Sequence, residues 1–453
     1  MAIFKASDTR PRSSLETRQG VNQWAALIIP LIISGAVGYA TWVVVVLVGV
    51  HYLLYPGPNT NVSPRPGAAA AVITLYFIFF LPMTVAYFRT VYVARQKPGV
   101  VSQGPERDTL RSTFVEEDYY QFEWPCCTPK HTPEDDPEKQ MQAQNKIPGY
   151  FIHLLDVDAM FKGDIEPPPG MEHFYRRPVF QCDPNGLPIW CGTCRNWKPD
   201  RVHHCSDNGR CVLKLDHFCP WVGGVVGEAN FKFFVQFNMY AMLYTAYVLI
   251  VMAVFVAEAV RVGTGIINIT WAVAIGLAAM FFFFTSGMSL KSTQDLVRNL
   301  TTVDAIDHTR RTVYLAVRLP DAQTAPAPSE DPIPWHGTIA YPFYTRDTPD
   351  SARGPRTTFA ILCTPPGLSP WNLGAMGNWK SVMGNTVFDW FVPWHKSPCA
   401  EHDETGSMYA LGPGYEELLR RAGIMSPDLR SNRDAGVTSP PRALLSRSEK
   451  SRR

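Results

Sequence analysis

The sequence has almost no net charge, because 42 lysines and arginines stand against 40 aspartates and glutamates, which gives +2 over 453 residues. A protein whose main partner is a nucleic acid usually carries a basic patch or a stripe of lysine and arginine. No long stripe of that kind occurs before the last residues, and the chain has no internal repeat. Nucleic acid is therefore excluded as the main partner.

Charged residues are missing altogether from four stretches, each of 21 residues or more. About 20 consecutive apolar residues are enough for a helix to cross the hydrocarbon core of a bilayer. The mean hydropathy of the whole chain, −0.08, conceals these stretches because the remaining residues are polar. A wholly soluble protein is excluded, and the absence of charge inside the stretches argues against a transporter or channel. The expected transmembrane helices are 24–50, 68–88, 233–257 and 262–290.

The charges outside these stretches predict the topology. The tail 1–23 is polar and precedes an apolar stretch too long for a signal peptide. It carries four basic residues, whereas the loop 51–67 carries only Arg65. The positive-inside rule therefore predicts a cytoplasmic N-terminus, and four spans return the C-terminus to the same side. The loop 89–232 and the tail 291–453, which ends in a Ser/Arg-rich segment expected to be disordered, are then cytoplasmic.

Cysteine is sparse, with ten residues in the chain, yet six of them fall between positions 182 and 219. Such placement does not suit a small secreted disulfide scaffold. Cys191 and Cys194 form a Cys-x-x-Cys pair, which alone is equally typical of two buried thiols. His204 and Cys211 follow at zinc-site spacing, which favours a metal. A zinc with four protein ligands would be structural, because no coordination position stays open.

A second pattern, Asp216-His217-x-Cys219, contains the parts of an activated thiol. A thiolate is a nucleophile, an imidazole can take the thiol proton, and a carboxylate can orient that imidazole. The pattern alone is weak, but it lies about a dozen residues before the span that begins at Phe233. A nucleophilic cysteine at the membrane surface indicates an acyl substrate embedded in the bilayer.

Basic residues surround both motifs and outnumber the acidic ones there. They suit a phosphate-bearing acyl donor such as acyl-CoA, although a solvated basic face is the commoner explanation for any single one of them. These residues are Arg195, Lys198, Arg201, Arg210 and Lys214.

Four of the twelve tryptophans fall within 24 residues of the tail, at positions 371, 379, 390 and 394. Tryptophan favours the headgroup region of a membrane, where its ring is buried and its N–H stays hydrated. We therefore expect this stretch to dock on the membrane surface, with a small soluble core as the alternative.

Together these motifs resemble the cysteine-rich domain of the DHHC protein S-acyltransferases, or palmitoyltransferases. Residues 301–304, Thr-Thr-Val-Asp, are similar to the family's Thr-Thr-x-Glu motif, and 370–384 is similar to its C-terminal aromatic motif. The resemblance implies an all-α membrane protein with four transmembrane helices and a small zinc-stabilised cytoplasmic cysteine-rich domain at about 189–231. The matching stretches are Cys191-Gly-Thr-Cys194, Lys198-Pro199-Asp200-Arg201, His203-His204-Cys205, Cys211-Val-Leu-Lys and Asp216-His217-Phe218-Cys219-Pro220-Trp221.

The resemblance also implies roles for individual residues. Cys219 would be the acylated nucleophile, His217 the general base and Asp216 its orienting partner, while Asp304 and Asn378 would serve packing or positioning. Palmitoyl-CoA would acylate Cys219, and the acyl group would then pass to cytoplasmic cysteines of membrane-associated substrate proteins. The zinc ligands implied by the resemblance are Cys191, Cys194, His204 and Cys211.

The chain departs from the family at the second zinc site. The corresponding positions are Cys205, Asn208, Phe218 and Val225, so three of four ligands are missing. Because the losses are correlated, we predict one zinc, with apolar contacts in place of the second and Cys205 packed as a lone thiol. The same loss motivates the alternative function, a catalytically silent zinc-bearing membrane scaffold.

Three further sites carry weaker hypotheses. Cys126-Cys127 is more typical of an ordinary loop pair than of an acylation or metal site. Cys363 and Cys399 are candidate acyl acceptors. Asn61-Val-Ser63 fits the glycosylation sequon, but the proline after it and the nearby membrane disfavour its use.

Overall fold

The computed structural model of the chain describes residues 14–57, 62–104, 157–262, 269–306, 308–320, 323, 325–327, 329, 331–402 and 408–424, with side chains from Gly20 onward. Several predicted features lie outside these residues. They are the sequon at Asn61, the Cys126-Cys127 pair, the start of the N-terminal tail and the Ser/Arg-rich C-terminal end. The expectations for them stay predictions.

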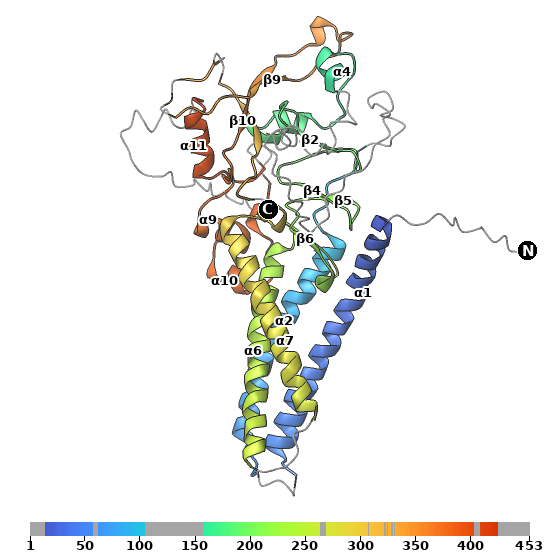
Figure 1. The fold of residues 1–453 in the computed structure, drawn as a ribbon, viewed down its shortest axis with the longest axis vertical. Coiled ribbons are helices and arrows are strands. Elements are labelled where there is room, and N and C mark those ends of the chain that lie inside the picture. The colour runs from blue at the N-terminus through green and yellow to red at the C-terminus, as the bar shows by residue number, and fades with distance from the viewer. Residues whose placement is uncertain are drawn as a thin grey trace, which may run out of the picture.

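Four long helical segments run side by side and confirm the expected four-helix membrane protein (Figure 1). Each is long and apolar enough to cross a bilayer. Their shared core is formed by buried aliphatic and aromatic side chains, with Tyr76 and Met252 among the most deeply buried. The segments are α1 (Ser14–Thr41) continued by the π-helix η1 (Trp42–Leu54), α2 (Pro66–Gln96), α6 (Phe231–Arg261) and α7 (Ile269–Arg298).

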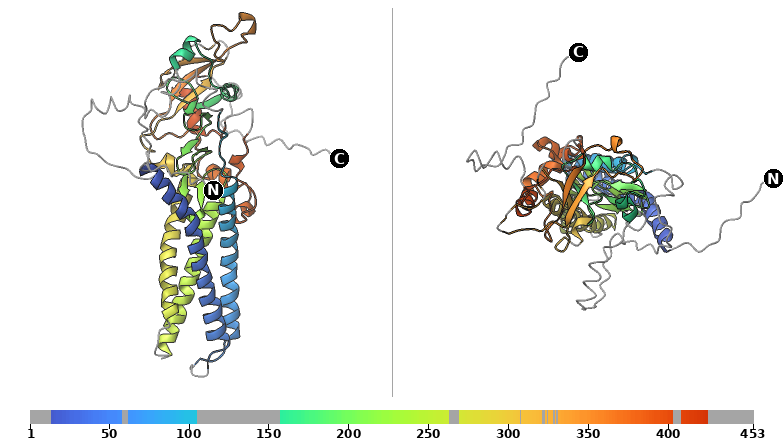
Figure 2. Two further views of the ribbon diagram at one scale, coloured as in Figure 1. Left: turned by 90° about the vertical axis from the view of Figure 1, so that its right-hand side faces the viewer. Right: turned by 90° about the horizontal axis from the view of Figure 1, so that it is seen from above.

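All the other described elements gather at one end of this bundle, as two perpendicular views show (Figures 1 and 2). Three of them are antiparallel hairpins of very short strands that follow one another along the cysteine-rich stretch. The hairpins are β2 (Ile189–Cys191) with β3 (Asn196–Lys198), β4 (His203–Cys205) with β5 (Arg210–Val212), and β6 (His217–Cys219) with β7 (Gly224–Val226). The 3-10 turn η4 (Pro220–Val222) joins the last two strands.

A four-stranded antiparallel sheet, which the sequence analysis did not predict, stands beyond the hairpins. Its strand order is β1 (Val179–Cys182), β8 (Tyr314–Arg318), β10 (Thr357–Cys363) and β9 (Gly337–Tyr341). One face buries aromatic side chains such as Phe180 and Phe359, and the other packs Leu315 against Trp371 and the tail. The sheet therefore joins the loop before the hairpins to the tail after α7.

The tail is folded over much of its described length. Its Pro-rich part is held by backbone hydrogen bonds from Ala327 to Gly423 and from Ile333 to Arg421. The remaining short elements are α4 (Val157–Lys162), α5 (Glu172–Tyr175), α8 (Thr302–Ala305), η5 (Asp350–Ala352), α9 (Ala375–Met383), α10 (Val387–Phe391), η6 (Pro398–Ala400) and α11 (Pro413–Arg421).

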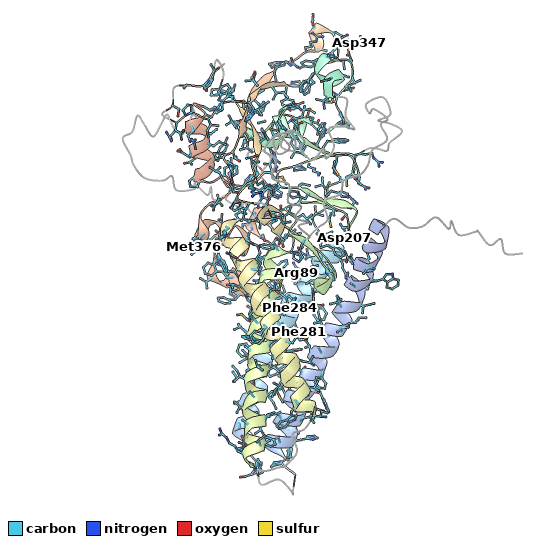
Figure 3. All side chains as sticks on the ribbon, in the orientation of Figure 1. Arg89, Asp207, Phe281, Phe284, Asp347 and Met376 are labelled. Carbon is cyan, nitrogen blue, oxygen red and sulfur yellow. The ribbon has the colours of Figure 1, made fainter. Side chains whose placement is uncertain are left out.

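One buried asparagine fixes the tail to the bundle. The Asn378 side-chain amide in α9 donates to the Val297 carbonyl at the end of α7 at 2.8 Å, and its Oδ1 accepts from the backbone N–H of Leu373 at 2.8 Å. Asn378 is fully buried, so losing these bonds would leave polar groups without water. Met376 on the same helix lies at the junction of the two parts of the molecule (Figure 3).

Candidate active site

The β6–β7 hairpin determines where Cys219 lies. His217, Phe218 and Cys219 pair in register with Val226, Val225 and Gly224. Pro220 ends the strand and starts the η4 turn, which Gly223 closes in the left-handed region at φ 72°. The Cys219 side chain is thereby buried, only 4% exposed, among residues of α2, α6 and α7.

Asp216 and His217 form a short, oriented pair beside this cysteine. The Asp216 Oδ2 atom lies 2.6 Å from His217 Nδ1, which leaves Nε2 as the ring nitrogen available to a thiol. Burial alone would lower the pKa of His217. Hydrogen bonds and charges from Asp216 and Cys219 outweigh burial and raise that pKa to about 10. His217 is therefore a stronger base than a free imidazole.

Thr302 holds the Asp216 carboxylate, a contact that the sequence analysis missed. Its backbone N–H donates to Oδ1 at 2.7 Å and its hydroxyl donates to Oδ2 at 3.1 Å. Thr302 begins α8 and belongs to the Thr-Thr-Val-Asp motif. Within that motif a role was predicted only for the aspartate, Asp304.

Asp304 anchors the same short helix. Its carboxylate and the Thr301 side chain form a capping box, and it accepts from Arg201 at 2.7 Å and from Arg311 at 2.6 Å. Burial by itself would raise the pKa of Asp304, but the charges of Arg201 and Arg311 lower it well below its usual range. Asp304 thus keeps its charge inside the protein and fixes the helix that presents Thr302.

The basic residues around the motifs do not form the expected surface for a phosphate-bearing donor. Lys198, Arg201 and Lys214 are 7%, 3% and 6% exposed. Arg201 is engaged by Asn299 and Asp304, and Lys214 lies near the Tyr409 ring. Only Arg195 and Arg210 of the five are partly exposed, so the five residues together form neither a phosphate-binding surface nor a solvated basic face.

The structure brings the four candidate zinc ligands together. The donor atoms of Cys191, Cys194, His204 and Cys211 all lie within 4.8 Å of one another. His204 Nδ1 is 3.3 Å from the Cys194 sulfur, and His204 faces Cys211 across the β4–β5 hairpin. Three thiols and one imidazole, without a carboxylate, are a donor set that suits tetrahedral zinc.

The positions that correspond to a second metal site form an apolar cluster instead. Cys205, Phe218 and Val225 pack with Val212 and Leu215, and Asn208 is exposed in the β4–β5 turn. These residues offer no set of metal ligands. Apolar contact joins the two hairpins at this point.

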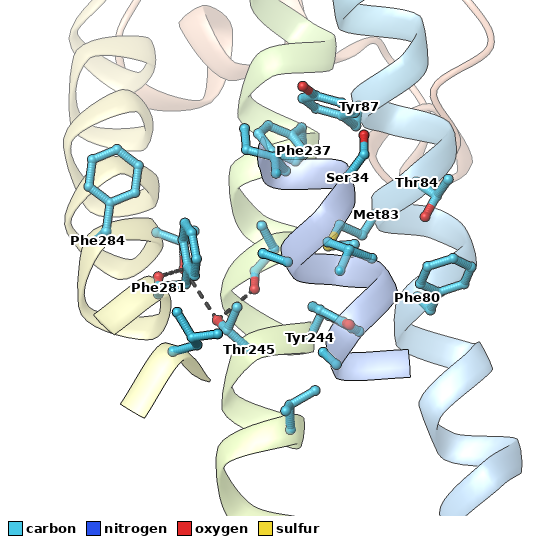
Figure 4. A pocket seen from close by; sticks show the side chains of 18 of the residues that line it. Ser34, Phe80, Met83, Thr84, Tyr87, Phe237, Tyr244, Thr245, Phe281 and Phe284 are labelled. Carbon is cyan, nitrogen blue, oxygen red and sulfur yellow. Dashed lines mark hydrogen bonds between the residues drawn. The ribbon is translucent and has the colours of Figure 1, made fainter. Parts of the chain in front are cut away.

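A cavity of about 330 Å³ lies within the helix bundle (Figure 4), and Cys219 is one of the residues that line it. All four helices contribute to its largely apolar wall. Deep in the bundle, hydroxyl groups link Thr41, Tyr76 and Tyr244 by hydrogen bonds of 2.6 and 2.8 Å. The cavity can hold an apolar chain whose reactive end meets the Cys219 sulfur. Its wall includes Ser34, Phe80, Met83, Thr84, Tyr87, Phe237, Thr245, Phe281 and Phe284.

The four tail tryptophans have separate environments. Trp371 is buried in the tail core, whereas Trp379 and Trp390 pack edge to face at 5.7 Å. Trp394 is 73% exposed. The tryptophan cluster is therefore part core and part surface, and docking of its exposed part on the membrane stays a prediction.

Cys363 ends β10, and Cys399 packs at the edge of the cluster that contains Cys219. Both are only partly exposed. Nothing in these positions tests whether either thiol accepts an acyl group, and that hypothesis stays a prediction.

Comparison with known proteins gives a consistent result. Residues 185–309 match the family described as DHHC palmitoyltransferase. Over 441 residues the chain is 34% identical to palmitoyltransferase pfa5 of Aspergillus fumigatus. The matched stretch covers 96% of this chain and 98% of that protein. It is 31% identical to pfa5 of Emericella nidulans, with 90% and 88% covered. A shorter stretch of 103 residues is 55% identical to palmitoyltransferase PFA3 of Kluyveromyces lactis, with 22% and 30% covered.

Proposed function

The chain belongs to the DHHC palmitoyltransferase family and is a protein S-palmitoyltransferase, and from that premise we propose that Cys219 carries the acyl group. His217 acts as the general base and Asp216 orients it. One observation carries the proposal: Cys219 both interacts with His217 of the Asp216–His217 pair and lines an apolar cavity. A long-chain acyl-CoA, with palmitoyl-CoA as the expected donor, supplies the group.

The geometry suggests two successive acyl-transfer steps. His217 takes the Cys219 proton, and the thiolate attacks the thioester carbonyl of the acyl-CoA, so that a new carbon–sulfur bond forms while the bond to CoA breaks. CoA leaves with the proton from His217. In the second step His217 takes the proton of a substrate cysteine, whose sulfur attacks the acyl group and releases Cys219. Asp216 keeps its charge throughout and stabilises the imidazolium.

We propose one structural zinc, held by Cys191, Cys194, His204 and Cys211. The ion would supply folding free energy to hairpins whose strands are only three residues long. The apolar cluster of Cys205, Phe218 and Val225 supports the view that packing replaces a second ion next to the active-site hairpin.

The active site lies at the end of the bundle that carries the folded loop and tail. We propose that this end is cytoplasmic, because basic residues flank the helices there. In the described part of the loop between η1 and α2, by contrast, Arg65 is the only basic residue. Substrates would then be membrane-associated proteins with cysteines on the cytoplasmic face.

A direct acylation assay tests the function. Purified protein mixed with palmitoyl-CoA should acquire palmitate that hydroxylamine removes, and the label should be found on the peptide containing Cys219. The alternative function, a silent scaffold of the same fold, predicts zinc binding without any label. It is favoured only by the lost second metal site, whereas a scaffold has no need of the oriented Asp216–His217 pair.

The pH dependence of acylation tests the role of Asp216. In Asp216→Asn the His217 pKa should fall, because the carboxylate that raises it to about 10 is gone. A weaker base favours the thiolate less, so acylation at pH 7 should slow by tenfold or more, since one pKa unit corresponds to about a tenfold change. The rate of the variant should rise with pH across a range in which the wild type is flat.

Thr302→Val should shift the same profile in the same direction but by less, because the backbone bond to Asp216 remains. Thr358→Val, on an exposed position of β10, is the matched control and should leave the profile unchanged. A wild-type profile in Asp216→Asn would contradict the proposed base.

The α10 region should dock on the membrane surface. Gln236 of α6 donates to the carbonyls of Asp389 and Trp390, which fixes one face of α10 to the bundle. The side chains of Phe388, Phe391 and Trp394 are 67%, 61% and 73% exposed, and α10 lies beside the end of α6 (Figure 1). Aromatic side chains at that level suit the interfacial region of a bilayer.

The measurement is hydrogen exchange of the peptide that contains α10, in lipid nanodiscs. Wild-type amides should be protected, and replacing Phe388, Phe391 and Trp394 by serine should speed exchange about tenfold, since more than one apolar anchor is lost. Lys396→Ala is the control. Equal exchange in lipid and in detergent would show that the face is not docked.

A further inference from the structure

The turn that follows Cys219 is held by residues that take no part in the proposed acyl transfer. The Tyr87 hydroxyl of α2 donates to the Trp221 carbonyl at 3.1 Å. The Tyr87 side chain is only 7% exposed and packs in the same cluster as Cys219. This hydrogen bond fixes the backbone two residues after the nucleophile.

A proline in α1 frees a backbone carbonyl that lies close to the same turn. Pro30 has no N–H, so the Ala26 carbonyl four residues earlier loses its usual helical donor. Arg95, at the end of α2, supplies a donor from another helix: its Nη2 lies 3.0 Å from the Ala26 oxygen. A side chain from a neighbouring helix commonly satisfies a carbonyl freed in this way.

Gly223 fits into the space where these groups meet. A Cβ atom at Gly223 would lie 2.8 Å from Arg95 Nη2 and 3.1 Å from the Ala26 oxygen. The next residue, Gly224, is equally close to α2, since a Cβ there would lie 3.1 Å from the Ala94 oxygen. The turn after Cys219 is thus pressed against the ends of α1 and α2.

The same end of α1 reaches a neighbouring hairpin. The Asn22 side chain donates to Asp207 Oδ1 at 2.9 Å, in the turn between β4 and β5. Asp207 lies next to the end of α1 (Figure 3). The first helix therefore lies against two of the three hairpins, through a polar contact at the β4–β5 turn and through close packing at the β6–β7 turn.

We propose that Tyr87, Arg95 and the carbonyl freed by Pro30 form a clamp that positions Cys219. The apolar cluster around Phe218 and Val225 fixes one side of the β6–β7 hairpin, and the clamp fixes the turn on the other side. In this chain, contacts with α1 and α2 position the nucleophile, a task for which a second metal ion would otherwise serve. These three are positioning residues, and the inference rests on the proposed role of Cys219.

Tyr87→Phe is the sharpest test, because it removes only the hydroxyl. In single-turnover acylation by palmitoyl-CoA, with full-length protein in phosphatidylcholine nanodiscs, the maximal rate should fall roughly three- to tenfold. The half-saturating palmitoyl-CoA concentration should change less than about twofold, because the cavity keeps its ring. Tyr92→Phe, on the exposed face of α2, is the matched control and should behave as wild type.

Pro30→Ala and Arg95→Ala test the hydrogen bond between Arg95 and the Ala26 carbonyl. An alanine at position 30 returns an N–H to the Ala26 carbonyl, so it removes the reason for the Arg95 bond. Each variant should slow the maximal rate about two- to fivefold, less than Tyr87→Phe because Arg95 is exposed. The double variant should be no slower than the slower single one, and Arg95→Lys should recover most of the rate. Lys97→Ala is the control.

The outcomes separate the clamp from the function. Zinc content equal to wild type shows that each variant is folded. Wild-type maximal rates in Tyr87→Phe, or fully additive losses in the double variant, overturn the clamp. If Cys219→Ser, measured alongside, still takes up hydroxylamine-sensitive label, the proposed role of Cys219 fails, because another cysteine then carries the acyl group. If it takes up none while the clamp variants match wild type, only the clamp is wrong.

Discussion

Cys219→Ser is expected to abolish both self-acylation and transfer, with less than about 1% of the wild-type rate remaining. A thiol beside His217 reacts as a thiolate, whereas a serine hydroxyl at neutral pH stays protonated and is a poor leaving group in the second step. The substitution is nearly isosteric and the site is buried, so the β6–β7 hairpin and the zinc site should be unaffected. Mass spectrometry of the peptide containing residue 219 and a gel-based palmitate label are the two measurements.

Two companion variants sharpen the result. His217→Ala should slow acylation by about 10²- to 10⁴-fold, the usual contribution of a general base. Cys363→Ser, at the end of the tail strand β10, should keep full activity and shows whether the loss is specific. Hydroxylamine-sensitive palmitate on Cys219→Ser would mean that another cysteine carries the acyl group.

Cys191→Ser is expected to remove the metal and with it the fold of the hairpins. Structural zinc sites bind with about 10–16 kcal/mol, which is more than the whole stability of many domains. One lost thiolate leaves three ligands around a buried site whose strands are too short to stand alone. Elemental analysis should give about one zinc per chain for the wild type and close to none for the variant, with acylation lost in parallel.

The matched control is Cys205→Ala, a cysteine of the neighbouring apolar cluster. Its loss should cost packing energy, about 1 kcal/mol, and leave the zinc content unchanged. Two zinc ions per wild-type chain, or a zinc content that falls equally in Cys205→Ala, would contradict the single-site proposal.

Local patterns predicted the parts of the molecule that depend on local sequence. The uncharged stretches predicted four membrane helices because a bilayer admits few alternatives for a chain segment of that kind. The spacing of Cys191 and Cys194 with His204 and Cys211 predicted a cluster that the structure contains. Asp216, His217 and Cys219 are close in sequence, and the short strand β6 together with the residue just before it brings them to one place.

Contacts between distant segments were not predictable in the same way. The sheet pairs β1 with β8, more than 130 residues later, and strands of four or five residues give little periodicity to read. Thr302 bonds Asp216 across 86 positions. The burial of Arg201 follows from Asp304 and Asn299, which are equally remote, whereas a basic residue in a cysteine-rich loop normally suggests a solvated surface.

The bond between Thr302 and Asp216 has a consequence for biosynthesis. Thr302 follows α7, so the carboxylate beside His217 gains its partner only after the last of the four helices has been synthesised and inserted. The same holds for the sheet, since three of its four strands come later still. In a nascent chain that stops before that point, the Asp216 carboxylate beside His217 lacks the two hydrogen bonds from Thr302. We therefore expect the Asp216 carboxylate to be held in place only once all four membrane helices have been synthesised.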